Sequence, residues 1–230
     1  MPTDFAGTDQ IVALAAARGM AVVPIVMYTP SWDAAPGLAA DLALPRDNRP
    51  YGGYLTTLIE RYGPRGSFWD QNPTLPRRPI RTREIWDEPD LRCFWPTPHW
   101  ASGYVAPLGR AHAAVRHADP GARAILAGLT AYSWLDLASI YHVRGARRLF
   151  DVVEVHPYTK YPGGVVRILS FVRATMDKAG DRGEPMIAGE TGWMSSLGQT
   201  PRLRTTKRPR AAKRAGSVRC CGCWPPTAPA

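Results

Sequence analysis

The stretch “IRTREIWDEP”, residues 80–89, is predicted to be a β-strand that ends on an acidic pair. Asp87 and Glu88 stand side by side, Trp86 precedes them and Pro89 follows at once. Two interpretations are open at this point: an acidic turn on the surface, or the mouth of an active site. The segments before and after the stretch decide between them.

Short apolar segments and amphipathic segments alternate on both sides of residues 80–89. Further strands are predicted at 21–28, 122–130, 151–159 and 184–193, and helices at 8–20, 51–63, 100–120, 133–150 and 165–180. The connections between them are only a few residues long. This alternation is typical of right-handed βαβ units around a parallel sheet, so the predicted fold class is α/β.

The first predicted helix and strand carry specific expectations. Thr8 or Asp9 is expected to cap the helix, because both side chains can accept a backbone N–H. Its apolar stripe is expected to consist of Ile11, Val12, Leu14 and Ala15. The strand at 21–28 is apolar at successive positions, which predicts cover on both of its faces.

The net charge of +10 belongs to one end of the chain. Eight of the 29 Lys and Arg residues lie in 201–230, where no Asp or Glu occurs, so the other residues carry 21 basic and 19 acidic groups. The body is therefore nearly neutral, and we expect no nucleic-acid partner. A nucleic-acid arm in the tail is the weaker alternative, which a steep salt dependence of binding would reveal.

Residues 1–196 are predicted to form the folded domain, and 197–230 allow two interpretations. They fit a disordered basic tail, or a C-terminus altered by a frameshift in a GC-rich gene. Three of the four cysteines (Cys220, Cys221 and Cys223) lie there without a second ligand cluster at zinc spacing, so neither a disulfide framework nor a metal is expected.

Targeting signals are not recognised in the sequence. The first ten residues lack the basic and apolar parts of a secretory signal. No apolar run approaches the roughly 18 residues of a membrane span, so no membrane partner is expected. The oligomeric state and the localisation are left open.

Three predicted strands end on polar side chains. Glu88 follows 80–87, His156 and Tyr158 follow the strand within 151–159, and Glu190 follows the last strand. In parallel α/β folds, ligands bind outside the carboxyl ends of the strands. The acidic pair is therefore interpreted as part of a site, not as a surface turn.

Four motifs in order resemble clan-A retaining glycoside hydrolases, and the nearest types are family 39-like or family 5-like. “EIWDEPDLRCFW” resembles their Trp-Asn-Glu-Pro motif, with Asp87 in place of Asn. “PIVMYTPSW”, “VEVHPY” and “AGETGW” resemble the ends of their third, sixth and seventh barrel strands. The resemblance covers about residues 8–196. It implies a partial (β/α)8 TIM barrel with about strands 3–7 present and strands 1, 2 and 8 missing.

The resemblance also implies the function. O-glycosidic bonds would be hydrolysed by a retaining double displacement in carbohydrate metabolism, with an oligosaccharide or glycoside as substrate and without cofactor or metal. Glu88 would be the acid/base and Glu190 the nucleophile. Full-length relatives are often secreted. Five strands cannot close a barrel, so impaired activity is expected, and the alternative is a non-catalytic remnant or sugar-binding relic.

Six further residues are expected to bind substrate through the same resemblance. They are Asp87, His156, Tyr158, Trp32, Trp86 and Trp193. Tyr158 would donate a hydrogen bond to Glu190, and His156 would line the same wall. The tryptophans would stack on sugar rings. Core packing is the alternative for the tryptophans, and a purely structural role is the alternative for His156.

Overall fold

The computed structural model describes residues 3–37 and 44–193. One compact unit spans Met1–Thr191, and Gly192 and Trp193 are the described residues of a second unit, Gly192–Ala230. The predicted tail at 197–230 lies outside the described residues. Within the described part of the chain, no helix has both the length and the apolar character that a membrane span requires.

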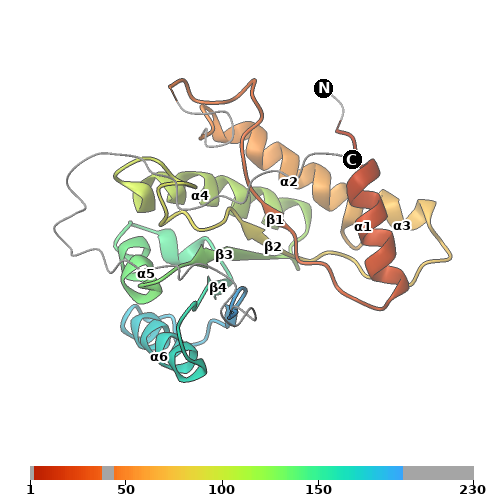
Figure 1. The fold of residues 1–230 in the computed structure, drawn as a ribbon. Coiled ribbons are helices and arrows are strands. Elements are labelled where there is room, and N and C mark those ends of the chain that lie inside the picture. The colour runs from red at the N-terminus through yellow and green to blue at the C-terminus, as the bar shows by residue number, and fades with distance from the viewer. Residues whose placement is uncertain (1–2, 38–43, 194–230) are drawn as a thin grey trace, which may run out of the picture. The chain divides into compact units, whose positions relative to one another are not determined.

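The described residues of the first unit form one parallel sheet in which the spatial order of the strands follows the chain (Figure 1). Its strands are β1 (Ile25–Val26), β2 (Thr82–Ile85), β3 (Arg123–Leu129), β4 (Val152–Val155) and β5 (Met186–Ala188). Sequential parallel pairing is the arrangement of consecutive βα units in a barrel. The predicted α/β class is confirmed.

One helix precedes the first strand, and the others connect successive strands. They are α1 (Ala6–Ala17), α2 (Asn48–Tyr62), α3 (Ser67–Gln71), α4 (Trp100–Ala118), α5 (Ser133–Tyr141), the short 3-10 helix η1 (Ala146–Arg148) and α6 (Pro162–Lys178). α2 packs against α4, and α5 packs against α6 (Figure 1). The single helix predicted at 133–150 is therefore wrong, because Gly145 adopts φ +83° and separates α5 from η1.

The middle and the edges of the sheet differ in burial. In β3, the six residues after Arg123 are buried, as expected for a central strand covered on both faces. In β1, Ile25 is 43% exposed, and in β5, Ile187 is 37% exposed. The expectation that the strand at 21–28 is covered on both faces is wrong, because β1 lies at an edge of the sheet and only Ile25 and Val26 pair with β2.

The first helix differs from its prediction at its start. α1 begins at Ala6, whose N–H donates to Asp4 Oδ1 at 2.9 Å, so neither Thr8 nor Asp9 is the residue that caps it. Asp9 lies inside the first turn and accepts hydrogen bonds from Arg61 Nε (3.1 Å) and the Tyr62 hydroxyl (2.7 Å) of α2. These contacts fix the face that α1 turns toward α2. Consequently only Val12 and Ala15 of the predicted stripe are buried, whereas Ile11 and Leu14 are exposed.

Candidate active site

The ends of β2, β4 and β5 present the polar residues of the candidate site. Because the strands are parallel, their carboxyl ends meet at one edge of the sheet. Backbone pairing continues one residue past each strand: Trp86 N donates to Val26 O (2.9 Å), His156 N to Leu129 O (2.9 Å) and Gly189 N to Val155 O (3.1 Å). The side chains that follow are therefore held by the ladder of the sheet itself.

The backbone after β2 adopts an unusual conformation. Trp86 has φ +70° and Glu88 has φ +41°, in the left-handed region that non-glycine residues rarely occupy. Each such residue costs on the order of 1–3 kcal/mol and persists only where its surroundings enforce it. For Trp86, the surroundings are the core, where its ring packs edge-on against Trp95 at a centroid distance of 5.3 Å. The core therefore determines the direction in which Asp87 and Glu88 leave the strand.

His156 is the centre of the site, and carboxylates of four residues surround it. The residue is 1% exposed. Its Nδ1 lies 2.9 Å from Glu88 Oε1 and 3.9 Å from Glu190 Oε2. Its Nε2 lies 3.8 Å from Glu154 Oε1 and 4.0 Å from Asp87 Oδ1. The structure thus brings Glu88, Glu190, Asp87 and His156 together, although they come from three strand ends.

This arrangement shifts two pKa values. Burial alone would lower the pKa of His156, but the carboxylates of Glu154 and Glu88 outweigh it and raise that pKa to about 10. Burial raises the pKa of Asp87 to about 6, and the negative charge of Glu88 adds to the shift. At neutral pH, His156 is therefore an imidazolium whose Nδ1–H donates to Glu88.

Tyr158 supports Glu190 from the solvent side. The Tyr158 hydroxyl donates to Glu190 Oε2 at 2.9 Å. This hydrogen bond, followed by partial burial, raises the pKa of Tyr158 to about 12. Both side chains remain substantially exposed, so a ligand can reach them. The hydrogen bond fixes the orientation of a carboxylate that solvent alone would leave free to rotate.

The three tryptophans of the predicted site lie in different environments. Trp86 is only 2% exposed and its Nε1 donates to Phe94 O at 3.2 Å, so its ring faces are covered by protein and it packs in the core. Trp32 is exposed in the loop after β1. Trp193 is exposed too, but it belongs to the second unit. The sugar-stacking expectation therefore fails for Trp86.

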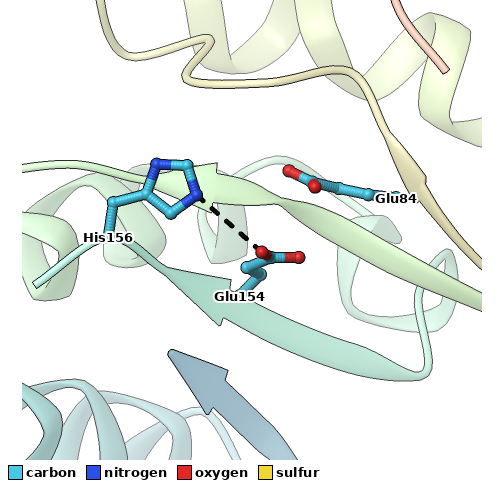
Figure 2. A group of neighbouring side chains, drawn as sticks. All are labelled: Glu84, Glu154 and His156. Carbon is cyan, nitrogen blue, oxygen red and sulfur yellow. Dashed lines mark ion pairs between the residues drawn. The ribbon is translucent and has the colours of Figure 1, made fainter. Parts of the chain in front are cut away.

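Two buried glutamates in the strands were not identified from the sequence. Glu84 of β2 and Glu154 of β4 extend toward His156 (Figure 2). Glu84 Oε1 accepts from Gly128 N at 2.8 Å, and burial together with the charge of Glu154 raises the pKa of Glu84 to about 8. A signal for Glu154 was available: it is charged within an apolar strand and shares a face with His156, two residues later.

A contact between Asp90 and Thr130, also not predicted from the sequence, joins the loop after β2 to the end of β3. The Asp90 carboxylate accepts hydrogen bonds from the backbone N–H of Thr130 at 3.3 Å and from its hydroxyl. Burial raises the pKa of Asp90, whereas these hydrogen bonds oppose the shift. The contact anchors the loop that carries Glu88.

Comparisons with known proteins address the fold. No protein-family model and no curated protein matches the sequence. Among solved structures, a glucosidase from Croceicoccus marinus matches with a TM-score of 0.64 and 15% identity over 86% of this chain and 40% of that one. A monomeric β-xylosidase from Caulobacter crescentus CB15 matches with a TM-score of 0.59 and 18% identity, over 84% of this chain and 42% of that one.

A third structure extends the comparison. A family 51 α-L-arabinofuranosidase from Bifidobacterium longum matches with a TM-score of 0.53 and 14% identity, over 80% of this chain and 37% of that one. The chain thus spans about two fifths of the length of these structures. The predicted partial (β/α)8 barrel is confirmed, and these three structures of similar fold are glycoside hydrolases.

Proposed function

We propose that the chain carries the site of a retaining glycoside hydrolase, with Glu88 as acid/base and Glu190 as nucleophile. One observation carries the proposal: oxygens of both carboxylates lie near the same atom, His156 Nδ1, at 2.9 Å and 3.9 Å. Glu88 Oε1 and Glu190 Oε2 are therefore at most 6.8 Å apart, the sum of these distances. This bound is compatible with the roughly 5–5.5 Å that separates the two carboxyl groups of retaining enzymes.

The chemistry follows from the two positions. Glu190 attacks the anomeric carbon while Glu88 gives its proton to the leaving oxygen, so that the glycosidic C–O bond breaks and a glycosyl-enzyme ester forms. Glu88 then removes a proton from water, which displaces Glu190 and releases the sugar. His156 and Tyr158 are positioning residues in this scheme. They orient Glu88 and Glu190 through hydrogen bonds of 2.9 Å each.

The substrate class is a glycoside of a neutral sugar. Structures with this fold include a glucosidase, a β-xylosidase and an α-L-arabinofuranosidase, so both hexosides and pentosides are candidates. Trp32 is exposed in the loop after β1, and Tyr158 is exposed beside Glu190. Their rings offer apolar faces for the C–H groups of a sugar. We place Asp87 at the sugar hydroxyl nearest the reacting carbon.

Sugar binding without hydrolysis is the second candidate function. It is favoured by the open edges of the sheet, since the exposed Ile25 and Ile187 show that β1 and β5 lack a neighbouring strand among the described residues. A site walled by part of a barrel can retain hydrogen bonds to a ligand. It can also lose the alignment that catalysis requires, because a displacement of about 1 Å can cost roughly 100-fold in rate.

An azide-rescue experiment tests the proposal. Purified protein is assayed with aryl β-glucosides, β-xylosides and α-L-arabinofuranosides. Glu88→Ala and Glu190→Ala are then assayed with azide, which replaces the missing carboxylate. We expect a glycosyl azide of retained configuration from Glu88→Ala and of inverted configuration from Glu190→Ala. Glu60→Ala, an exposed position in α2, serves as the control.

The outcomes separate the two candidates. Binding of a sugar without hydrolysis in the parent protein would favour the sugar-binding function. Hydrolysis that survives Glu190→Ala without azide would contradict the proposed nucleophile. The absence of both binding and hydrolysis across the panel, in protein shown to be folded by circular dichroism, would contradict both candidates.

A further inference from the structure

A buried group of side chains lies next to the proposed catalytic carboxylates. The group consists of Glu84 of β2 and of Glu154 and His156 at the end of β4. Each residue offers one nitrogen or oxygen atom, and the three atoms all lie within 4.8 Å of one another. All three residues are buried. We call this group the inner cluster. Because Glu84 and Glu154 lie within paired strands and the backbone of His156 bonds to Leu129, the cluster is held by the sheet.

His156 Nε2 points into the inner cluster (Figure 2). Among the described residues this buried atom has no hydrogen-bond partner. Its distance of 3.8 Å from Glu154 Oε1 is too long for a hydrogen bond. The same distance is suitable for two atoms that bind one metal ion. Two such ligand atoms lie about 3–4 Å apart when each is about 2.0–2.2 Å from the ion. An ion between His156 Nε2 and Glu154 Oε1 would therefore contact both atoms.

The other nitrogen of His156 is already oriented. Nδ1 contacts Glu88 Oε1 at 2.9 Å. A histidine that binds a metal almost always donates its second N–H to a carboxylate or carbonyl, which fixes the ring and leaves the first nitrogen free for the ion. Glu88 supplies that carboxylate here. The ring is therefore held in the orientation that metal binding requires.

Two glycines keep the space of the inner cluster open. A Cβ on Gly128 would lie 2.1 Å from His156 Nε2, and a Cβ on Gly189 would lie 1.5 Å from Glu154 Oε1. Any other residue at either position would displace a ligand atom. In residues 3–37 and 44–193, no Lys or Arg lies within ion-pair distance of Glu84 or Glu154. A divalent cation would replace the Nε2 proton of the His156 imidazolium, which is released on binding, and would take over the pairing with Glu154.

We infer that Glu84, Glu154 and His156 bind one divalent transition-metal ion of the zinc class. One imidazole nitrogen and two carboxylate oxygens are a donor set that suits Zn²⁺, with a fourth position left for water. Ca²⁺ and Mg²⁺ prefer six or more oxygen ligands, which the inner cluster does not offer. The ion would join β2 to β4 and hold His156 against Glu88. This inference does not depend on whether the chain hydrolyses glycosides.

Direct metal binding tests the inference. The full chain, without a histidine tag, carries Cys220→Ser, Cys221→Ser and Cys223→Ser so that thiols do not compete. Protein stripped with a chelator is titrated with Zn²⁺ by calorimetry, and bound metal is counted by elemental analysis. We expect one Zn²⁺ per chain and a higher Tm in its presence. Glu154→Gln should lower the affinity by about tenfold or more, whereas Glu60→Gln should leave it unchanged.

Three variants locate the ion even where Glu154→Gln folds poorly. Glu88→Gln, which changes only the outer partner of His156, should weaken Zn²⁺ binding by about 10–100-fold. Asp87, His156 and Glu190 form a second group with metal-ligand spacing. Asp87→Asn and Glu190→Gln should leave the affinity unchanged if the ion lies in the inner cluster. Loss of binding in either of them, with Glu154→Gln binding as the parent does, would overturn the inference. A stoichiometry near zero would do so as well.

Discussion

His156 Nδ1 lies 2.9 Å from Glu88 Oε1, so the end of β4 is joined to the end of β2 across the intervening strand β3. The contact can form because Gly128 of β3 has no side chain. A Cβ there would lie 2.1 Å from His156 Nε2. The proposed acid/base is therefore positioned by a histidine that depends on a glycine in the strand between them.

Gly128→Ala tests this dependence. We expect it to lower the free energy of unfolding by about 1–3 kcal/mol, because the imidazole must leave its place in a packed interior. Gly53→Ala is the matched control, since a Cβ at that position in α2 meets no heavy atom of the described chain within 4 Å. That substitution should instead stabilise by roughly 0.5–1 kcal/mol. Urea unfolding measures both, and equal effects of the two substitutions would contradict the role of Gly128.

Stability should fall as pH rises from about 4.5 to 10. The folded pKa of His156 is about 10 against an ordinary 6.5, so its stabilisation is complete below 6.5 and lost as pH rises to about 10. The pKa of Glu84 is about 8 against 4.5, so folding favours its protonated form and weakens as pH rises from 4.5 to 8. Both shifts have the same sign. The total change is on the order of a few kcal/mol.

Urea unfolding at several pH values, with a chelator present, measures this dependence. The glutamine side chain of Glu84→Gln does not titrate. In this variant the free energy of unfolding should therefore fall less between pH 4.5 and 8, and it should still fall above pH 8. A free energy of unfolding that stays constant or increases over this pH range in the parent protein would be inconsistent with the buried positions of the two side chains.

Asp87→Asn should increase glycosidase activity near pH 7 by about tenfold, the value of one hydrogen bond of roughly 1.4 kcal/mol. An amide donates to a sugar hydroxyl, whereas an ionised carboxylate only accepts. The pKa of Asp87 is about 6, so the parent protein should become more active as pH falls through 6 and Asp87 gains a proton. The variant should lack that increase. Initial rates on an aryl β-glycoside test this, with exposed Asp70→Asn as the control; unchanged or lower activity in Asp87→Asn would refute the idea.

Tyr158→Phe removes the hydroxyl that lies 2.9 Å from Glu190 Oε2. We expect kcat/KM to fall by about fivefold to tenfold, since a hydrogen bond to a partly exposed carboxylate contributes roughly 1–1.5 kcal/mol. The Tm should not change, because Tyr158 is exposed. Tyr161→Phe, at a still more exposed position, is the control. A loss of Tm without a change in kcat/KM would show that the hydroxyl has only a structural role.

The sequence predicted the parallel sheet and the grouping of Glu88, His156 and Glu190, because parallel strands place their carboxyl ends together. It did not predict the direction in which the Trp86 side chain points. The φ of +70° at Trp86 interrupts the pattern in which successive side chains along β2 point to opposite faces of the sheet. Tertiary packing sets that angle. The position of Glu154 in the inner cluster was predictable, since its spacing from His156 puts both side chains on one face of the strand.

The sequence also could not predict whether Asp9 caps a helix or makes a tertiary contact. Asp9 has the side chain of a capping residue, but its carboxylate bonds to Arg61 and Tyr62, which are more than fifty residues away. Local sequence carries no information on such partners.

Covalent trapping with a 2-fluoroglycoside tests the central claim most directly, namely that Glu88 and Glu190 form a retaining pair. The fluorine slows release of the sugar from the nucleophile, so the glycosyl-enzyme accumulates. We predict one added sugar per chain by mass spectrometry of the intact protein, located on the peptide that contains Glu190 and absent from Glu190→Gln. Attachment at another residue, or no attachment in folded protein that hydrolyses an aryl glycoside, would contradict the claim.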